Sequence, residues 1–329
     1  MRPSADGVHL FFPSRNEVSK VRPFHHALAM LAAVALLAQP SAGGESGRSG
    51  PAYHVAVAAR GQGPLNLYVE ESGHGEPIVL LHGIGASTYE WRLIVPALAR
   101  RHRVLNLDLK GFGRSDKPDD GRYSPIDQGA LVKAFLVRQG LTQVTLIGHS
   151  LGGGIALATT IDANRTHPGL IRRLVLIDSA AYPQQFSDSL KVLRDPVLGP
   201  LSLAILPPEF IAMLALTDDS SVKSAAPEDI LSYAQPLYSA GAKDALLATA
   251  RQINPLNSDR LTQLYRTIRQ QTLLIWCRKD DVVPLSVGER LARNLPHAQL
   301  HVLETCSHVP IEEEPKATAR LITRFLARH

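Results

Sequence analysis

The chain has 329 residues, of which 45% are hydrophobic, and its formal net charge is +5. This length and composition suffice for a sizeable buried core, in one large domain or in a domain with an insertion. Beyond residue 42 no cluster of Lys and Arg is interleaved with aromatic residues, so the charge gives little support for nucleic-acid binding. The HExxH, paired-Cys and Gly-x-x-x-x-Gly-Lys motifs are absent from the sequence, which therefore predicts no metal ion, nucleotide or other cofactor.

Residues 27–38, ALAMLAAVALLA, form an unbroken apolar run behind the basic residues Lys20 and Arg22. A helix of this length would extend about 18 Å, which is shorter than the roughly 30 Å hydrocarbon core of a bilayer. A cleavable secretory signal over residues 1–42 therefore explains the run better than a stable membrane span. We expect a secreted or periplasmic protein, with an uncleaved signal anchor as the alternative, and a flexible Gly- and Ser-rich linker over residues 43–52.

The folded domain is predicted to cover residues 53–329 and to begin with an antiparallel hairpin, formed by residues 53–59 and 65–70. Short, continuous apolar runs then predict strands that are buried on both faces. These runs cover residues 77–81, 104–109, 144–147, 174–177, 272–277 and 299–303. Amphipathic or helix-forming stretches alternate with them, at residues 89–101, 125–139, 151–160, 286–294 and 315–326. Strands that alternate with helices indicate an α/β fold, with a mostly parallel sheet flanked by helices.

The alternation of strands and helices stops between about residues 181 and 271. This stretch is rich in Pro, Leu and Ala, and helix-like patches cover residues 210–216, 228–233 and 243–253. We expect a helical insertion that lies over the sheet as a lid.

The pattern Gly-x-Ser-x-Gly occupies residues 148–152, GHSLG, at the junction of a predicted strand and a predicted helix. This placement is typical of a nucleophile elbow, a tight turn that holds a serine in strained backbone angles above the sheet edge. Gly153 and Gly154 would let the helix pack closely on the strand. Ser150 is therefore the predicted nucleophile, and it needs a base because a free hydroxyl is a weak nucleophile.

Polar loops follow the last two predicted strands, and in parallel sheets the carboxyl ends of the strands are where ligands bind. His308 comes directly after the final strand and is the predicted base. Asp280 follows the preceding strand and is the favoured acid, which would orient the imidazole and stabilise its charged form. Asp281 and Asp178, the latter at the end of an earlier strand, remain alternative acids.

A developing oxyanion also needs hydrogen-bond donors aimed at it. The N–H of Leu151, at the start of the helix after the elbow, is one candidate. The N–H of Ile84, in the glycine-rich loop after the strand at residues 77–81, is the second. The alternative for that loop is that His82 and Gly83 simply end the strand.

Five segments make the chain resemble the α/β-hydrolase family, over roughly residues 65–328. They are LLHGIGAS at 80–87, DLKGFGRSDKP at 108–118, GHSLGGG at 148–154, RKDDVVP at 278–284 and SHVPIEEEP at 307–315. Ser150, Asp280 and His308 also follow the family's chain order. The resemblance implies a lid-bearing serine hydrolase of the esterase or lipase type, whereas an aspartate at the elbow would imply a dehalogenase or an epoxide hydrolase. Two residues depart from the family pattern: Cys277 replaces a usual glycine, and Cys306 stands beside the usual Gly-His.

Cys277 and Cys306 are the only cysteines, and both fall at the ends of predicted neighbouring strands. We interpret them as two small buried thiols. The alternative, in an exported protein, is a disulfide beside the acid and base loops.

The favoured function is a serine hydrolase that cleaves small, apolar carboxylic esters through an acyl-enzyme intermediate. The same triad would also serve a carbon–carbon bond hydrolase acting on a diketone, or a cofactor-free perhydrolase. A third interpretation is a non-enzymatic member of the fold that only binds a ligand. The sequence leaves the natural substrate, the acyl chain length and the oligomeric state open.

Overall fold

The computed structural model describes residues 50–183, 185–217, 226–254 and 258–328. The predicted signal at residues 1–42 and most of the predicted linker lie outside the described residues. Within these ranges, no helix is both long enough and apolar enough to cross a membrane.

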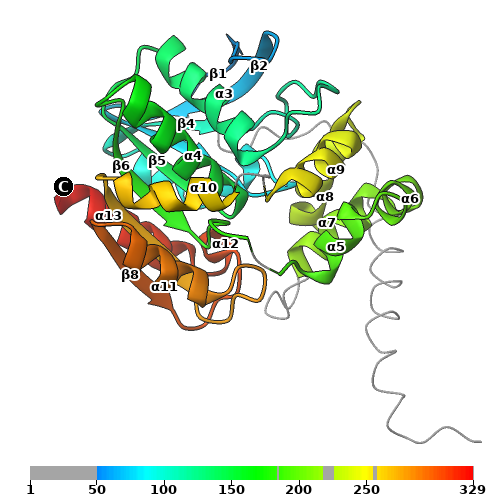
Figure 1. Cartoon of the computed structure of the whole chain (residues 1–329). Helices are drawn as coiled ribbons and strands as arrows, with labels where there is room; N and C mark the ends of the chain where they lie inside the picture. The colour runs from blue at the N-terminus through cyan, green and yellow to red at the C-terminus, as the bar shows by residue number, and fades with distance from the viewer. Residues whose placement is uncertain (1–49, 184, 218–225, 255–257, 329) are drawn as a thin grey trace, which may run out of the picture. The chain divides into compact units, whose positions relative to one another are not determined.

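Among the described residues, eight strands form a mostly parallel sheet in the order β1-β2-β4-β3-β5-β6-β7-β8 (Figure 1). The strands are β1 (Ala52–Val57), β2 (Leu65–Ser72), β3 (Glu76–Leu81), β4 (His102–Leu107), β5 (Val144–His149), β6 (Ile171–Ile177), β7 (Gln271–Cys277) and β8 (Ala298–Leu303). β2 pairs antiparallel with β1 and with β4, and the remaining neighbours pair parallel. The predicted α/β fold and its antiparallel edge are confirmed.

Helices cover both faces of the sheet because alternate residues of its central strands point to opposite sides. In β3, Val79 and Leu81 belong to one apolar cluster, whereas Ile78 and Leu80 belong to the other. The first cluster includes side chains of α3 (Pro125–Arg138), α4 (Leu151–Thr166) and α11 (Leu285–Asn294). The second includes side chains of the 3₁₀ helix η2 (Thr88–Trp91), α2 (Val95–Leu98), α12 (Pro310–Glu313) and α13 (Pro315–Arg328).

The predicted amphipathic stretch at residues 89–101 forms two short helices, η2 and α2, in place of one long helix. Pro96 lies in the first turn of α2. Proline has no N–H to donate to the preceding turn, so it can begin a helix but cannot join η2 and α2 into one.

The interval between β6 and β7 contains a helical insertion. Its helices are α5 (Asp188–Arg194), α6 (Leu198–Ile205), α7 (Pro208–Thr217), α8 (Pro227–Ala234), η3 (Gln235–Tyr238), α9 (Ala242–Gln252), α10 (Ser258–Gln263) and η4 (Leu264–Thr267). Figure 1 shows α5 to α9 gathered to one side of the sheet, whereas α10 lies near α4. Side chains of α7 and α8 pack in one apolar cluster with Ala86 and Tyr89, which follow β3.

The start of α4 packs against the end of β3 without a side chain between them. A Cβ atom added to Gly152 would lie 2.1 Å from the Leu81 carbonyl oxygen and 2.7 Å from the His82 carbonyl oxygen. Both are main-chain atoms, so a larger residue would have to push the helix away from the sheet.

Replacing Gly152 with Ala should lower the free energy of unfolding by about 3 kcal/mol, since the added methyl group overpacks the contact between α4 and β3. Gly63→Ala is the matched control, because a Cβ atom there meets nothing within 4 Å. Urea denaturation of both variants measures the difference. Equal stability of the two variants would contradict the close contact.

Candidate active site

Ser150 joins β5 to α4 with φ 50° and ψ −116°, a backbone conformation that residues other than glycine rarely adopt. Such a residue costs on the order of 1–3 kcal/mol, so the surrounding structure must hold it in place. The Ser150 N–H donates to the Ile177 carbonyl at 3.0 Å, and the Ser150 carbonyl accepts the Ala180 N–H at 3.0 Å. The end of β6 and the segment after it therefore fix the turn that presents the hydroxyl.

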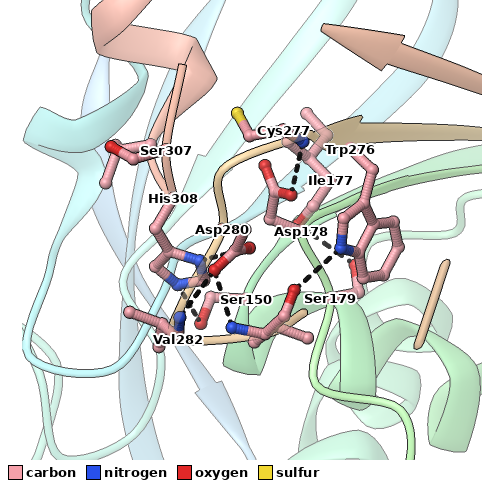
Figure 2. Close-up of polar contacts among 12 residues, drawn as sticks. Ser150, Ile177, Asp178, Ser179, Trp276, Cys277, Asp280, Val282, Ser307 and His308 are labelled. Atoms are coloured by element: carbon pink, nitrogen blue, oxygen red, sulfur yellow. Dashed lines mark hydrogen bonds and ion pairs between the residues drawn. The ribbon is translucent and has the colours of Figure 1, made fainter. Parts of the chain in front are cut away.

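The structure brings the predicted nucleophile, base and acid together, and Figure 2 shows the His308 ring between Asp280 and Ser150. His308 Nε2 lies 3.1 Å from Ser150 Oγ, and His308 Nδ1 lies 2.9 Å from Asp280 Oδ2. Asp280 is 4% exposed, and its Oδ1 accepts the N–H groups of Val282 and Val283 at 2.8 and 2.7 Å. A carboxylate here accepts the Nδ1 proton, which leaves the Nε2 lone pair to accept the Ser150 hydroxyl proton.

The two alternative acids do not take this position. Asp281 is exposed to solvent. Asp178 is fully buried after β6, where its Oδ1 accepts the Cys277 N–H at 2.9 Å. Asp280 is therefore the acid that contacts the imidazole.

Asp178 is a buried carboxyl group close to Asp280, and its surroundings favour the protonated form. Burial raises the pKa of Asp178 well above its usual value, and the negative charge of Asp280 raises it further. Its Oδ2 atom has no hydrogen-bond partner among the described residues. A proton on Asp178 avoids the cost of a second buried carboxylate beside Asp280.

The two predicted oxyanion donors belong to adjoining segments. Leu151 is the first residue of α4, and Ile84 follows Gly83 in the loop after β3. This loop contacts the elbow, since a Cβ atom on Gly83 would lie 3.1 Å from His149 Nδ1. Within the described chain, neither the Ile84 nor the Leu151 N–H donates to another main-chain or side-chain group. Both can therefore bind an anion, and their role as an oxyanion hole remains a prediction.

Glu313, at the end of α12, holds the loop that carries His308, a role that we did not predict from the sequence. Its carboxylate accepts the Ser307 N–H at 3.0 Å, the Ser307 hydroxyl at 2.9 Å and the Val309 N–H at 2.9 Å. These bonds flank His308 on both sides. Proline at the first helical position, with glutamate later in the same turn, is the sequence signal that could have indicated such a bond.

Cys277 and Cys306 form a disulfide, so the interpretation of two free thiols is wrong. In the parallel pair of β7 and β8, Cys277 lies beside Leu303, and the chain after Leu303 brings Cys306 to a Cα–Cα distance of 5.2 Å. This distance is within the range that a disulfide spans. The bond ties the loop of Asp280 to the loop of His308.

A hydroxyl, an imidazole, a carboxylate and two N–H donors are the groups that acyl transfer to serine requires. The hydrogen bonds that link His308 to Asp280 and to Ser150 measure 2.9 and 3.1 Å, and both distances allow proton transfer. In the part of the chain that the structure describes, no group of three or more His, Cys, Asp or Glu side chains is arranged to hold a metal ion.

Comparison with known proteins defines the family. The alpha/beta hydrolase fold family matches residues 76–315, and the chain belongs to it. A 2-hydroxymuconate semialdehyde hydrolase from Pseudomonas sp. is 32% identical over 80% of this chain and 91% of its own length. A 2-hydroxy-6-oxo-2,4-heptadienoate hydrolase from Pseudomonas putida is 29% identical over 80% of this chain and 94% of its own length. A solved meta-cleavage product hydrolase from Pseudomonas fluorescens has a TM-score of 0.67 and 25% identity, over 83% of this chain and 97% of that one.

Replacing Asp178 with Asn should raise the free energy of unfolding relative to the wild type, and the gain should grow from about pH 5 to pH 8. The pKa of the Asp178 carboxyl is raised in the folded protein and ordinary in the unfolded chain, so wild-type stability falls as pH rises above the ordinary value. Asn keeps the acceptor for the Cys277 N–H and has no proton to lose. Denaturation across this pH range is the measurement, and a difference that does not change with pH would contradict a raised pKa of Asp178.

The purified protein should show no free thiols under denaturing, non-reducing conditions. The double variant Cys277→Ser, Cys306→Ser should lose about 3–4 kcal/mol of unfolding free energy, because the bond links residues 29 positions apart. Thiol titration and urea denaturation provide the two measurements, with reduced wild type as the control. Two titrating thiols in the unreduced protein would show that the disulfide is absent.

Proposed function

We propose that this protein is a serine hydrolase that cleaves a carbon–carbon bond beside a ketone, in a substrate of the 2-hydroxy-6-oxo-dienoate class. The hydrogen-bond chain from Asp280 through His308 to Ser150 carries the proposal, because it supplies an activated nucleophile. The substrate class is supported by two relatives, named as hydrolases of 2-hydroxymuconate semialdehyde and of 2-hydroxy-6-oxo-2,4-heptadienoate. Their names favour this activity over the ester cleavage that we expected from the sequence.

The reaction begins when His308 Nε2 takes the proton of the Ser150 hydroxyl while Ser150 Oγ attacks the keto carbon. The carbonyl oxygen becomes an oxyanion, which accepts hydrogen bonds from the N–H groups of Ile84 and Leu151. Asp280 stabilises the positive charge that this step places on His308.

Collapse of the tetrahedral intermediate breaks the bond between the former keto carbon and its neighbour. The substrate reacts as its 2,6-diketo tautomer, formed when the 2-hydroxyl proton moves to the carbon beside the 6-ketone. That carbon is then saturated and lies next to a C=C–C=O unit, so the electron pair passes into a dienolate that extends to the oxygen on carbon 2, and His308 returns the proton to this fragment. The other fragment remains bound as an ester of Ser150. Water, deprotonated by His308, hydrolyses this ester to a carboxylic acid and restores the free hydroxyl.

We also propose that the helical insertion acts as a lid over this site. Tyr89 Oη and Arg92 Nη2, which follow β3, donate to Asp229 of α8 at 2.8 and 2.6 Å. Arg92 Nη1 donates to Glu312 of α12 at 2.6 Å, and Tyr233 of α8 donates to the same carboxylate. α8 therefore contacts both the segment after the oxyanion loop and the helix after the base loop, which supports a role in covering the substrate.

Purified protein should consume 2-hydroxy-6-oxo-2,4-heptadienoate, followed by the loss of its conjugated absorbance, with a higher kcat/KM than p-nitrophenyl esters of graded chain length. Ser150→Ala should lower kcat by on the order of 10⁴-fold or more, because the nucleophile is lost. Ser239→Ala, at an exposed position in the insertion, is the control and should retain activity. Preferential turnover of the esters would contradict the carbon–carbon assignment, and unchanged turnover by Ser150→Ala would contradict the serine mechanism.

We further propose that the protein is exported, on the basis of the apolar run at residues 27–38. The bond between Cys277 and Cys306 supports this proposal, because disulfides persist in oxidising compartments and are rare in the cytosol. N-terminal sequencing of protein recovered outside the cytosol should find a mature chain that begins shortly after residue 42. An unprocessed chain confined to the cytosol would contradict export.

A further inference from the structure

A second histidine–carboxylate pair lies directly behind the nucleophile. His149 precedes Ser150 and is 2% exposed, and Glu90 of η2 is 3% exposed. His149 Nδ1 lies 3.0 Å from Glu90 Oε1, and His149 Nε2 lies 2.8 Å from the carbonyl oxygen of His308. Neither side chain takes part in the proton transfers of the triad.

Both ring nitrogens of His149 face oxygen acceptors, so both carry a proton and the ring is a cation. Burial favours the neutral ring, but the carboxylate of Glu90 outweighs this effect and raises the pKa of His149. Burial also opposes ionisation of Glu90, yet the charge of His149 lowers the pKa of Glu90. The two side chains therefore form a buried imidazolium–carboxylate pair.

The other titratable groups that face this pair are His82, Tyr233, Asp280 and His308. The ring of His82 is held by main-chain groups, since its Nε2 accepts a main-chain N–H at 3.0 Å and its Nδ1 lies 2.7 Å from a main-chain carbonyl oxygen. Burial raises the pKa of Tyr233 well above its usual value, so its hydroxyl keeps its proton. Asp280 and His308 are the triad members, and the rings of His149 and His308 are 5.1 Å apart.

The pair connects the two loops on which the triad chemistry depends. Glu90 Oε2 accepts the Gly83 N–H at 3.0 Å, directly before the proposed oxyanion donor Ile84. At its other end, His149 Nε2 donates to the main-chain carbonyl of His308. A continuous chain of hydrogen bonds therefore runs from the oxyanion loop to the base loop, behind the nucleophile.

Stability alone does not explain charged residues at this position. Replacing a buried ion pair by apolar residues of similar size is often neutral or stabilising, so such pairs are weak evidence of a structural role. Glu313 anchors the N–H groups on either side of His308, whereas His149 anchors the His308 carbonyl itself. Together these bonds fix the orientation of the peptide that carries the imidazole.

We propose that Glu90 and His149 are positioning residues, which hold the His308 imidazole and the Ile84 N–H at the positions from which both act on a substrate bound to Ser150. The inference rests on the proposed serine mechanism, in which both groups act on the same tetrahedral intermediate. A displacement of either loop by about 1 Å would lower the rate on the order of 100-fold.

The double variant Glu90→Leu, His149→Leu tests this inference, because it removes both charges together and leaves no unpaired ion. With p-nitrophenyl acetate, an activated ester, its kcat should fall about 100-fold while KM changes less than about threefold. Glu71→Gln with Arg103→Met is the matched control, an ion pair between β2 and β4 that should be dispensable for kcat. A folded double variant with the wild-type kcat overturns the inference.

Glu90→Gln separates positioning from a purely structural role through the pH profile. The glutamine keeps an acceptor for the Gly83 N–H and can donate to a neutral His149, whose Nε2 still donates to the His308 carbonyl. In the wild type, the ion pair is present below the raised pKa of His149 and is lost above it, so kcat should fall on the alkaline side. The variant should retain most of the wild-type kcat and lack this alkaline fall. An identical alkaline fall in both proteins overturns the inference, including when the double variant does not fold.

Ser150→Ala in the same assay separates this inference from the proposed function. Loss of turnover in Ser150→Ala, together with a wild-type kcat in the Glu90 and His149 variants, rejects the positioning role alone. Unchanged turnover in Ser150→Ala rejects the serine mechanism, and the positioning role with it.

Discussion

The backbone conformation of Ser150 is the constraint on which the rest of the site depends. Its positive φ is unfavourable for a residue with a side chain, and the main-chain bonds to Ile177 and Ala180 hold it there. The same turn requires glycine on either side, since a Cβ atom on Gly148 would lie 2.4 Å from the Gly152 carbonyl oxygen. This turn places the hydroxyl at the carboxyl edge of the sheet, where the loops after β7 and β8 begin.

These two loops are held by bonds between segments that are distant in the chain. The disulfide ties the end of β7 to the loop after β8, Glu313 caps that loop from α12, and the Asp280 carboxylate is fixed by the turn that follows it. Asp178 lies close to Asp280, and its raised pKa favours the protonated form, which adds no second charge. Packing and hydrogen bonding around the triad therefore fix the imidazole before any substrate arrives, which is the condition for efficient proton transfer.

The α/β fold and the triad residues could be predicted from the sequence because their signals are local. The tight turn needs small residues at fixed spacing around Ser150, and the apolar strands that end in polar loops indicate where Asp280 and His308 lie. The supporting bonds could not be predicted in this way, since Glu90 and His149 are 59 positions apart and meet only after β3 and β5 have paired. The same limit explains the error over the disulfide, which depends on the path of the loop after β8.

Discrimination between ketone and ester substrates depends on the pocket and not on the triad, because one nucleophile and one base serve both reactions. The relatives support the carbon–carbon assignment. The insertion between β6 and β7 is where the regular alternation of strands and helices stops. The nucleophile itself is common to every enzymatic interpretation of this chain.

Labelling with a fluorophosphonate, followed by peptide mass spectrometry, tests whether Ser150 is the nucleophile and His308 its base. We expect a single adduct on Ser150, formed at a rate that falls by on the order of 10³-fold or more in His308→Gln, because the hydroxyl then has no base. An adduct on another residue, or a labelling rate that is independent of His308, would contradict these roles.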